Sequence, residues 1–128
     1  MVVKINGKEH EVRFGLKFVA ELDKAYDKSG NSGYGVGLSY AVPLLLSGDM
    51  RTLSEVLHHS FCTEKAAPSK DDVDYYIETV EDIEGLLEEV LTELKNANAT
   101  KIMTRKMEQL YAQVQKGQET TLETQVDK

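Results

Sequence analysis

Short alternating segments at the N-terminus predict a β-hairpin. Apolar residues dominate positions 2–5, Asn6-Gly7 follows, and positions 8–14 again mix polar and apolar side chains. Asparagine and glycine both tolerate the positive φ angles of a type I′ turn, so this pair favours a two-residue hairpin loop. A lone hairpin is marginally stable in water, and we expect this one to pack against helices. If the register allows it, the residues that share its buried side are Ile5, Val12 and Phe14.

A first helix is predicted over residues 16–27, directly after Gly15. Apolar side chains recur there at helical spacing, which would bring them to one face. They are Phe18, Val19, Leu22, Ala25 and Tyr26. Residues 29–35 are rich in glycine and asparagine and show no periodicity, so we expect a loop there.

The second predicted helix, over residues 36–47, is apolar nearly all round. Its apolar residues are Val36, Leu38, Tyr40, Ala41, Val42, Leu44, Leu45 and Leu46. Pro43 lacks a backbone N–H and should either kink this helix or mark its first turn. A helix without a polar face is either the buried centre of a domain or a surface that awaits a partner.

Three further helical patterns precede the last one. Asp49 is a good N-cap for the first, whose inward face would hold Leu53, Val56, Leu57, Ser60 and Phe61. A break at 66–68 ends it, and Ser69 with Asp72 resembles a capping box. The apolar stripe that follows drifts around the helix axis near Glu81-Asp82, so we predict a bend there and two helices, the second reaching Asn96.

A final amphipathic helix is predicted to end at Gly117. Its apolar residues are Ile102, Met103, Met107, Leu110, Tyr111 and Val114. Residues beyond it are mostly polar, which indicates a flexible tail. The pattern as a whole predicts a mainly α fold: a short N-terminal hairpin packed on a bundle of about five to six helices. We expect a single helical domain over residues 1–116 and a flexible tail over 117–128.

Composition agrees with one ordinary globular domain. The chain has 128 residues, 41% of them hydrophobic and 29% charged, which suffices for a single core. No apolar run approaches the roughly 20 residues that span a bilayer. The N-terminus lacks the apolar stretch of a signal peptide, and the single cysteine, Cys62, cannot form an internal disulfide. We therefore expect a soluble cytosolic protein that does not associate with membranes.

Charge is divided sharply along the chain. Residues 71–94 hold ten acidic side chains and no Lys or Arg, whereas residues 95–116 hold five Lys or Arg and only Glu108 as an acid. The acidic block repels nucleic acid, so the whole chain is a poor candidate for binding it. The simplest interpretation is a pair of neighbouring helices with complementary solvated faces; the alternative is that one block is a docking surface for a charged partner.

Candidate chemistry is sparse. Glu55, His58 and Cys62 would share one face of a helix, but three ligands on one helix, without a second Cys or His pair elsewhere, are weak support for a metal site. His58 and His59 are adjacent and would point about 100° apart. The glycines between 30 and 37 lack the Lys and Ser or Thr of a phosphate-binding loop. We predict no catalytic residue, no cofactor and no enzymatic activity.

Several short segments, taken together and in order, resemble the tail assembly chaperones of long-tailed bacteriophages of Gram-positive hosts. The resemblance extends from residue 2 to about residue 105. The segments are INGKE (5–9), FG (14–15), ELDK (21–24), GVGL (35–38), LLSGD (45–49), PS (68–69), VEDIE (80–84) and ELK (93–95). No single segment is specific, and the order and spacing of the set carry the resemblance.

The resemblance implies a role in virion assembly. Proteins of this family coat the long tape measure protein in the host cytoplasm, are displaced as the tail tube forms, and are absent from the mature virion. It therefore implies the tape measure protein as partner, with the tail tube protein as a second candidate, and self-association into an oligomer. Our candidate contact residues come from the apolar helix and its glycine loop. They are Tyr34, Tyr40, Leu44 and Leu45, for which the alternative is a plain core role.

Two other functions stay open at this point. A small regulator could bind nucleic acid through the basic segment from Lys101 to Lys116, although the acidic block counts against it. A metal-dependent enzyme would have to use Glu55, His58 and Cys62, which is the weakest of the three hypotheses.

Overall fold

The N-terminal hairpin forms as predicted in the computed structural model, which describes the backbone of residues 1–126 and the side chains of residues 1–117. Strands β1 (Val2–Ile5) and β2 (Lys8–Glu11) pair antiparallel. Asn6 and Gly7 have φ angles of 54° and 76°, the left-handed values that a type I′ turn requires. The predicted inward residues Ile5, Val12 and Phe14 are all buried.

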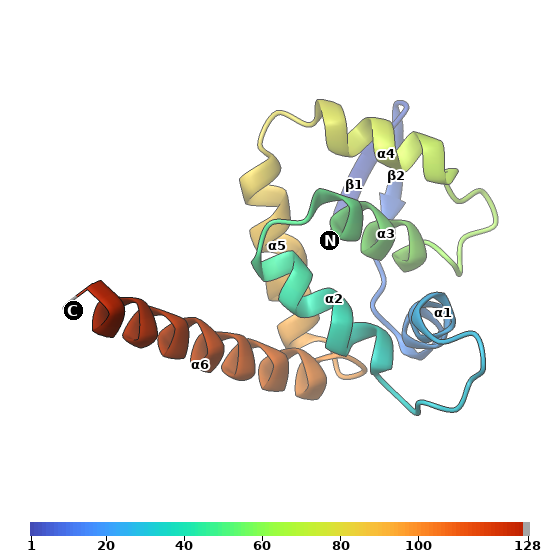
Figure 1. Cartoon of the computed structure of the whole chain (residues 1–128). Coiled ribbons are helices and arrows are strands. Elements are labelled where there is room, and N and C mark those ends of the chain that lie inside the picture. The colour runs from blue at the N-terminus through green and yellow to red at the C-terminus, as the bar shows by residue number, and fades with distance from the viewer. Residues whose placement is uncertain (127–128) are drawn as a thin grey trace.

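Six helices follow, so the predicted mainly α fold is confirmed. They are α1 (Leu16–Tyr26), α2 (Val36–Leu46), α3 (Met50–Ser60), α4 (Lys70–Thr79), α5 (Ile83–Asn96) and α6 (Lys101–Val126). Figure 1 shows the hairpin lying behind α3 and α4 at one end and α6 leaving the molecule at the other. The predicted bend near Glu81-Asp82 separates α4 from α5.

Side chains that precede three of these helices cap them. The Asp49 carboxylate accepts a hydrogen bond from the Thr52 N–H at 3.2 Å, and the Ser69 hydroxyl accepts one from the Asp72 N–H at 3.1 Å. The Asp82 carboxylate accepts a hydrogen bond from the Gly85 N–H at 2.9 Å. Each cap satisfies a backbone donor that the first turn of a helix leaves unpaired, and this explains why the chain starts helices there.

Helix α2 is the centre of the core. It packs between α1 and α6 and also contacts α3 and α5. Leu38, Ala41 and Val42 are fully buried, as the apolar pattern allowed. Pro43 lies inside the helix, so of the two positions that the sequence left open the first turn is excluded. It removes the N–H that would otherwise reach the Ser39 carbonyl one turn earlier.

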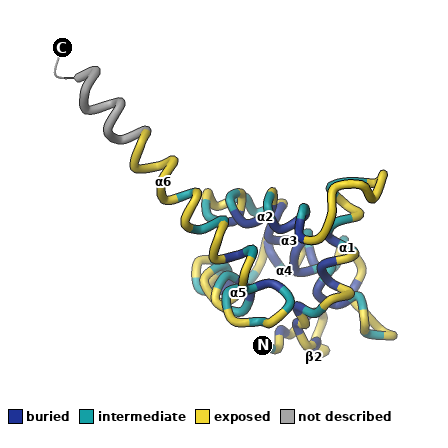
Figure 2. Tube along the Cα trace, turned by 90° about the horizontal axis from the view of Figure 1, so that it is seen from below, coloured by how far each residue is buried: buried dark blue, intermediate teal, exposed yellow. Residues whose placement is uncertain are grey.

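Helix α6 extends away from the body. Figure 2 shows that the last turns of α6 before residue 118 already lie outside the packed helices and are exposed, whereas its first turns pack on the body. It reaches Val126, past Gly117 where the sequence predicted its end. The predicted flexible tail over 117–128 falls mostly outside the residues whose side chains are described. The division into a domain over 1–116 and that tail stays a prediction.

Candidate partner-binding surface

One face of α2 is left uncovered by the rest of the fold. Tyr40 and Leu44 lie one helical turn apart on it, with 57% and 38% of their surface exposed. The Tyr40 ring stacks on Tyr26 of α1, with ring centroids 5.5 Å apart and planes 6° from parallel. Stacking holds the exposed ring in a fixed orientation, as a preorganised contact requires.

Leu45, the next residue after Leu44, points away from this exposed face. It is fully buried in the core, together with Leu38 and Val42. Of the four contact residues predicted from the sequence, the structure therefore brings Tyr40 and Leu44 together on the surface and gives Leu45 the core role that was its alternative.

Tyr34 joins the glycine loop to the turn between α5 and α6. Its hydroxyl donates a hydrogen bond to the Ala99 carbonyl at 2.6 Å, while more than half of the side chain is exposed. Partial burial, and to a lesser degree the Asp23 carboxylate, raise the pKa of the Tyr34 phenol above its usual value. The hydroxyl therefore stays a hydrogen-bond donor throughout the physiological pH range.

A groove of about 550 Å³ runs beside Tyr34. It lies where the chain leaves the hairpin and passes the turn between α5 and α6. Its lining is Val12, Arg13, Phe14, Gly15, Leu16, Tyr34, Ala97, Asn98 and Ala99. Leu16 is 71% exposed on its wall. Sequence reasoning missed Leu16, although an apolar residue at the start of α1, off the face of Phe18 and Leu22, was a usable signal.

The start of α2 is held against α1 by Asp23. Its carboxylate accepts hydrogen bonds from the backbone N–H groups of Gly35, at 3.0 Å, and Gly37, at 2.8 Å. Gly35 is the N-cap and has no side chain to do this, so α1 supplies the cap. This arrangement fixes the glycine loop and the exposed α2 face relative to α1.

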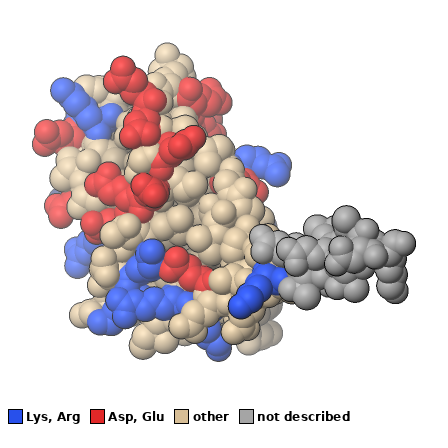
Figure 3. Space-filling view, turned by 90° about the vertical axis from the view of Figure 1, so that its left-hand side faces the viewer, with Lys and Arg blue, Asp and Glu red and all other residues tan. Residues whose placement is uncertain are grey.

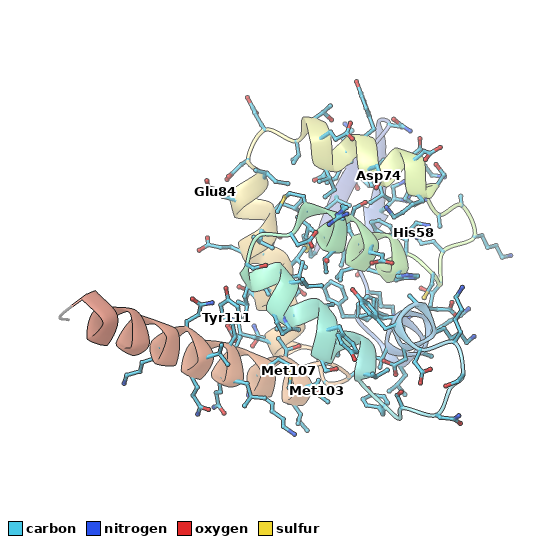
Figure 4. The ribbon with its side chains drawn as sticks, in the orientation of Figure 1. His58, Asp74, Glu84, Met103, Met107 and Tyr111 are labelled. Carbon is cyan, nitrogen blue, oxygen red and sulfur yellow. The ribbon has the colours of Figure 1, made fainter. Side chains whose placement is uncertain are left out.

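Methionines join α6 to the body. Met103 and Met107 are partly buried against the core, and Figure 4 shows both, with Tyr111, along the part of α6 nearest α2. Leu110 and Val114, farther along the same helix, are exposed. The sequence identified this apolar stripe, but not that the body covers only its first part.

The charged blocks do not pair as complementary neighbours. Helices α5 and α6 are in contact, but the ion pair between them joins Lys95 of α5 to Glu108 of α6 at 3.4 Å, two residues of the basic block 95–116 rather than one from each block. Figure 3 shows carboxylates gathered at the height of α4 and α5, and Lys and Arg side chains in a row at the height of α6. Within the described side chains, Asp74 is the one acid of residues 71–94 in an ion pair, with Lys70.

The titratable groups of α3, and Cys62 in the turn after the helix ends at Ser60, form no recognisable reaction centre. Burial, and then the neighbouring His59, lower the pKa of His58, and burial raises the pKa of the Cys62 thiol, which makes it a poor nucleophile at neutral pH. Figure 4 shows His58 near Asp74, whose carboxylate is held by Ser54 and Lys70. In the described part of the chain, Glu55, His58 and Cys62 do not form a metal-binding group, nor does any other set of three such residues.

No helix in the described residues combines the length and apolar character needed to cross a bilayer.

Comparison with known proteins agrees with the resemblance seen in the sequence. The family model described as "Phage tail assembly chaperone protein, TAC" matches residues 2–109. Searches of curated proteins and of solved structures find no significant match.

Proposed function

The chain belongs to the family of phage tail assembly chaperones, and on that premise we propose that it binds the tape measure protein, keeps it soluble during tail assembly and is then released. The tape measure protein is a long helix with exposed apolar stripes, which aggregates unless it is covered. Its binding here takes place in the host cytoplasm, with the tail tube protein taking over as the tube forms, and the chaperone is left out of the mature virion.

The exposed apolar face of α2 is the observation that carries this proposal. Tyr40 and Leu44 are spaced one turn apart, and Leu16 and Tyr34 line a groove by the same glycine loop. A helical ligand presents apolar side chains at intervals of three and four residues, which suits such a face and groove. The role needs no catalytic group, in keeping with a chaperone family.

The acidic side chains of α4 and α5 support the same function by repulsion rather than by contact. Many like charges on one part of the surface keep a complex soluble and discourage contacts with other anionic proteins. Release requires that each contact be modest, so many copies along one tape measure protein would supply the overall affinity.

Coexpression with the tape measure protein of the same phage tests the proposal. The unmodified chaperone should raise the soluble fraction of the tape measure protein and copurify with it. The double variant Tyr40→Asp, Leu44→Asp should lose both effects, because a carboxylate on an apolar contact is costly to bury. Tyr40 stacks on Tyr26 and Leu44 is 38% exposed, so the variant should lose about 1–2 kcal/mol of stability and stay folded, which circular dichroism checks.

Tyr75 provides a matched control. It is a tyrosine on α4 with 62% of its surface exposed, close to the value for Tyr40. Tyr75→Asp changes the same side chain by the same charge away from the proposed surface and should leave copurification intact. Equal loss in both variants would remove α2 as the binding face, and a tape measure protein that stays insoluble with the unmodified chaperone would remove the function itself.

A further inference from the structure

Leu16 borders two hollows on the surface of the chain. It lines the groove of about 550 Å³ described above and also a second hollow of about 260 Å³, which includes Lys17 and Thr63. Arg13 and Gly15 line both of them as well. Leu16 is 71% exposed, so most of this apolar side chain faces water. An exposed apolar side chain beside hollows has the shape that receives the side chains of a packed helix.

The charged side chains at these two hollows are both cations. Arg13 lines both hollows and Lys17 lines the second, and the described residues around them include no carboxylate. Both side chains are exposed, and neither forms an ion pair within the described part of the chain. Glu21, one turn after Lys17 on α1, is paired with Lys24 at 3.5 Å instead. The hollows therefore present two uncompensated positive charges, although the whole chain has a net charge of −7.

Hydrogen bonds hold the walls of the groove in place. The Arg13 N–H donates to the Ser60 carbonyl at 3.2 Å, which ties the exit of the hairpin to the end of α3. In the same groove, Tyr34 is fixed by the bond from its hydroxyl to the Ala99 carbonyl. A surface that is ordered before binding loses less conformational entropy when a ligand binds.

The groove and the exposed face of α2 are separate parts of the surface. Leu16 begins α1, whereas Tyr26, on which Tyr40 stacks, ends it. The 11 residues of this helix span about 15 Å. Substitutions at the groove therefore leave the contacts of Tyr40 in place, and the two surfaces can be tested independently.

We propose that the groove takes an acidic amphipathic segment, in which an apolar side chain packs against Leu16 and a carboxylate within one helical turn of it pairs with Arg13. This inference rests on the proposed function, since the segment belongs to the tape measure protein. Arg13 and Lys17 then select which segment of a long apolar partner is bound, because complementary charges contribute more to specificity than to affinity. A basic segment is repelled from the groove.

Two fluorescently labelled peptides of equal length test this chemistry directly. Both are amphipathic helices with leucines at the same intervals of three and four residues, and they differ only in carrying Glu or Lys beside those leucines. In anisotropy titrations at low salt, the unmodified chain should bind the Glu peptide about tenfold more tightly than the Lys peptide. The net charge of −7 by itself favours the Lys peptide, so the expected preference can come only from the local cations.

Reversing the charges at the groove should invert this preference. Arg13→Glu with Lys17→Glu should bind the Lys peptide more tightly than the Glu peptide. Lys4→Glu with Lys8→Glu makes the same change of charge on exposed residues of the hairpin and is the matched control, which should keep the original preference. Leu16→Ser should weaken the binding of both peptides without changing the preference, since it removes apolar surface and keeps both cations. Circular dichroism checks that each variant is folded.

Two outcomes would overturn the proposal. The unmodified chain could bind the two peptides equally or prefer the Lys peptide, or its preference for the Glu peptide could survive in folded Arg13→Glu, Lys17→Glu. Failure of the proposed function looks different, because the tape measure protein then stays insoluble on coexpression whatever the peptides show. A tape measure protein that is kept soluble by a chain without the peptide preference removes this inference alone.

Discussion

The carboxylate of Asp23 accepts a hydrogen bond from the backbone N–H of Gly37 at 2.8 Å, and so closes the N-terminus of α2 from a neighbouring helix. Asp23 belongs to the ELDK segment and Gly37 to the GVGL segment, two of the short segments that carry the family resemblance. This hydrogen bond gives a physical reason for the presence of both segments, because α1 supplies the N-terminal cap of α2 that the glycine loop lacks.

Gly37→Ala should destabilise the fold by about 1–3 kcal/mol. A Cβ at this position would lie 2.8 Å from the Leu22 backbone carbonyl, so α1 and α2 would have to move apart. Urea denaturation followed by circular dichroism measures the loss. Gly15→Ala is the control, because its Cβ would make only an ordinary contact, 3.7 Å from the Arg13 side chain.

Asp23→Ala should cost about 1–2 kcal/mol, because it removes two hydrogen bonds and a negative charge from the N-terminus of α2. Asp23→Asn keeps an acceptor oxygen but not the charge, and should lose less. The order of the two variants in thermal or urea unfolding checks the capping role. An alanine variant as stable as the original chain would contradict it.

Tyr34→Phe separates the two roles of this side chain. It removes the hydrogen bond to the Ala99 carbonyl and should lower stability by about 1 kcal/mol or less, but it keeps the ring beside the groove. Copurification of the tape measure protein should survive this change and should be lost in Tyr34→Ser. If Tyr34→Phe alone abolishes copurification, the hydroxyl rather than the ring makes the contact.

Stability should fall as the pH drops below about 6.5, the usual pKa of histidine. Burial lowers the pKa values of His58 and His59 in the folded chain. The unfolded chain therefore binds more protons than the folded chain in this pH range, and a falling pH shifts the equilibrium toward the unfolded chain. Unfolding midpoints measured between pH 8 and pH 5 should therefore decline for the original chain. The decline should be shallower in His58→Gln, His59→Gln, which cannot take up these protons.

Mobility-shift titration with duplex DNA at low salt should show no binding. The exposed cations of α6 are outnumbered by the carboxylates of α4 and α5 in the same molecule, which repel a phosphate backbone. A salt-sensitive shift that disappears in Arg105→Glu, Lys106→Glu would revive the alternative of a nucleic-acid-binding regulator.

Local signals in the sequence were sufficient for most of the secondary structure. Asn6-Gly7 specifies its turn through φ angles that few other residues adopt, and Asp49 and Ser69 begin helices through bonds to residues three positions ahead. The bend at Glu81-Asp82 followed from the drift of the apolar stripe. All of these depend on residues close together in the chain.

The candidate surface depended on contacts that the sequence could not show. The apolar pattern treats Leu44 and Leu45 alike, yet Leu45 is fully buried and Leu44 is on the surface, because the neighbouring helices leave one side of α2 uncovered. His10 is a polar residue of strand β2, yet it is buried, and its ring lies 2.7 Å from the carboxylate of Glu64, 54 residues away. The sequence could mark Leu16 as lying off the buried face of α1, but only the structure places it in one groove with the turn between α5 and α6.

The sequence by itself determined the hairpin, the order of the helices, their caps and the family, because these depend on neighbours within a few residues and on the order of short segments. Tertiary packing alone decided which apolar residues are covered, where α6 leaves the body, and that the acidic and basic blocks do not pair within one chain. Periodicity defines a helical face, but whether that face is buried depends on the orientation of distant helices that pack on it.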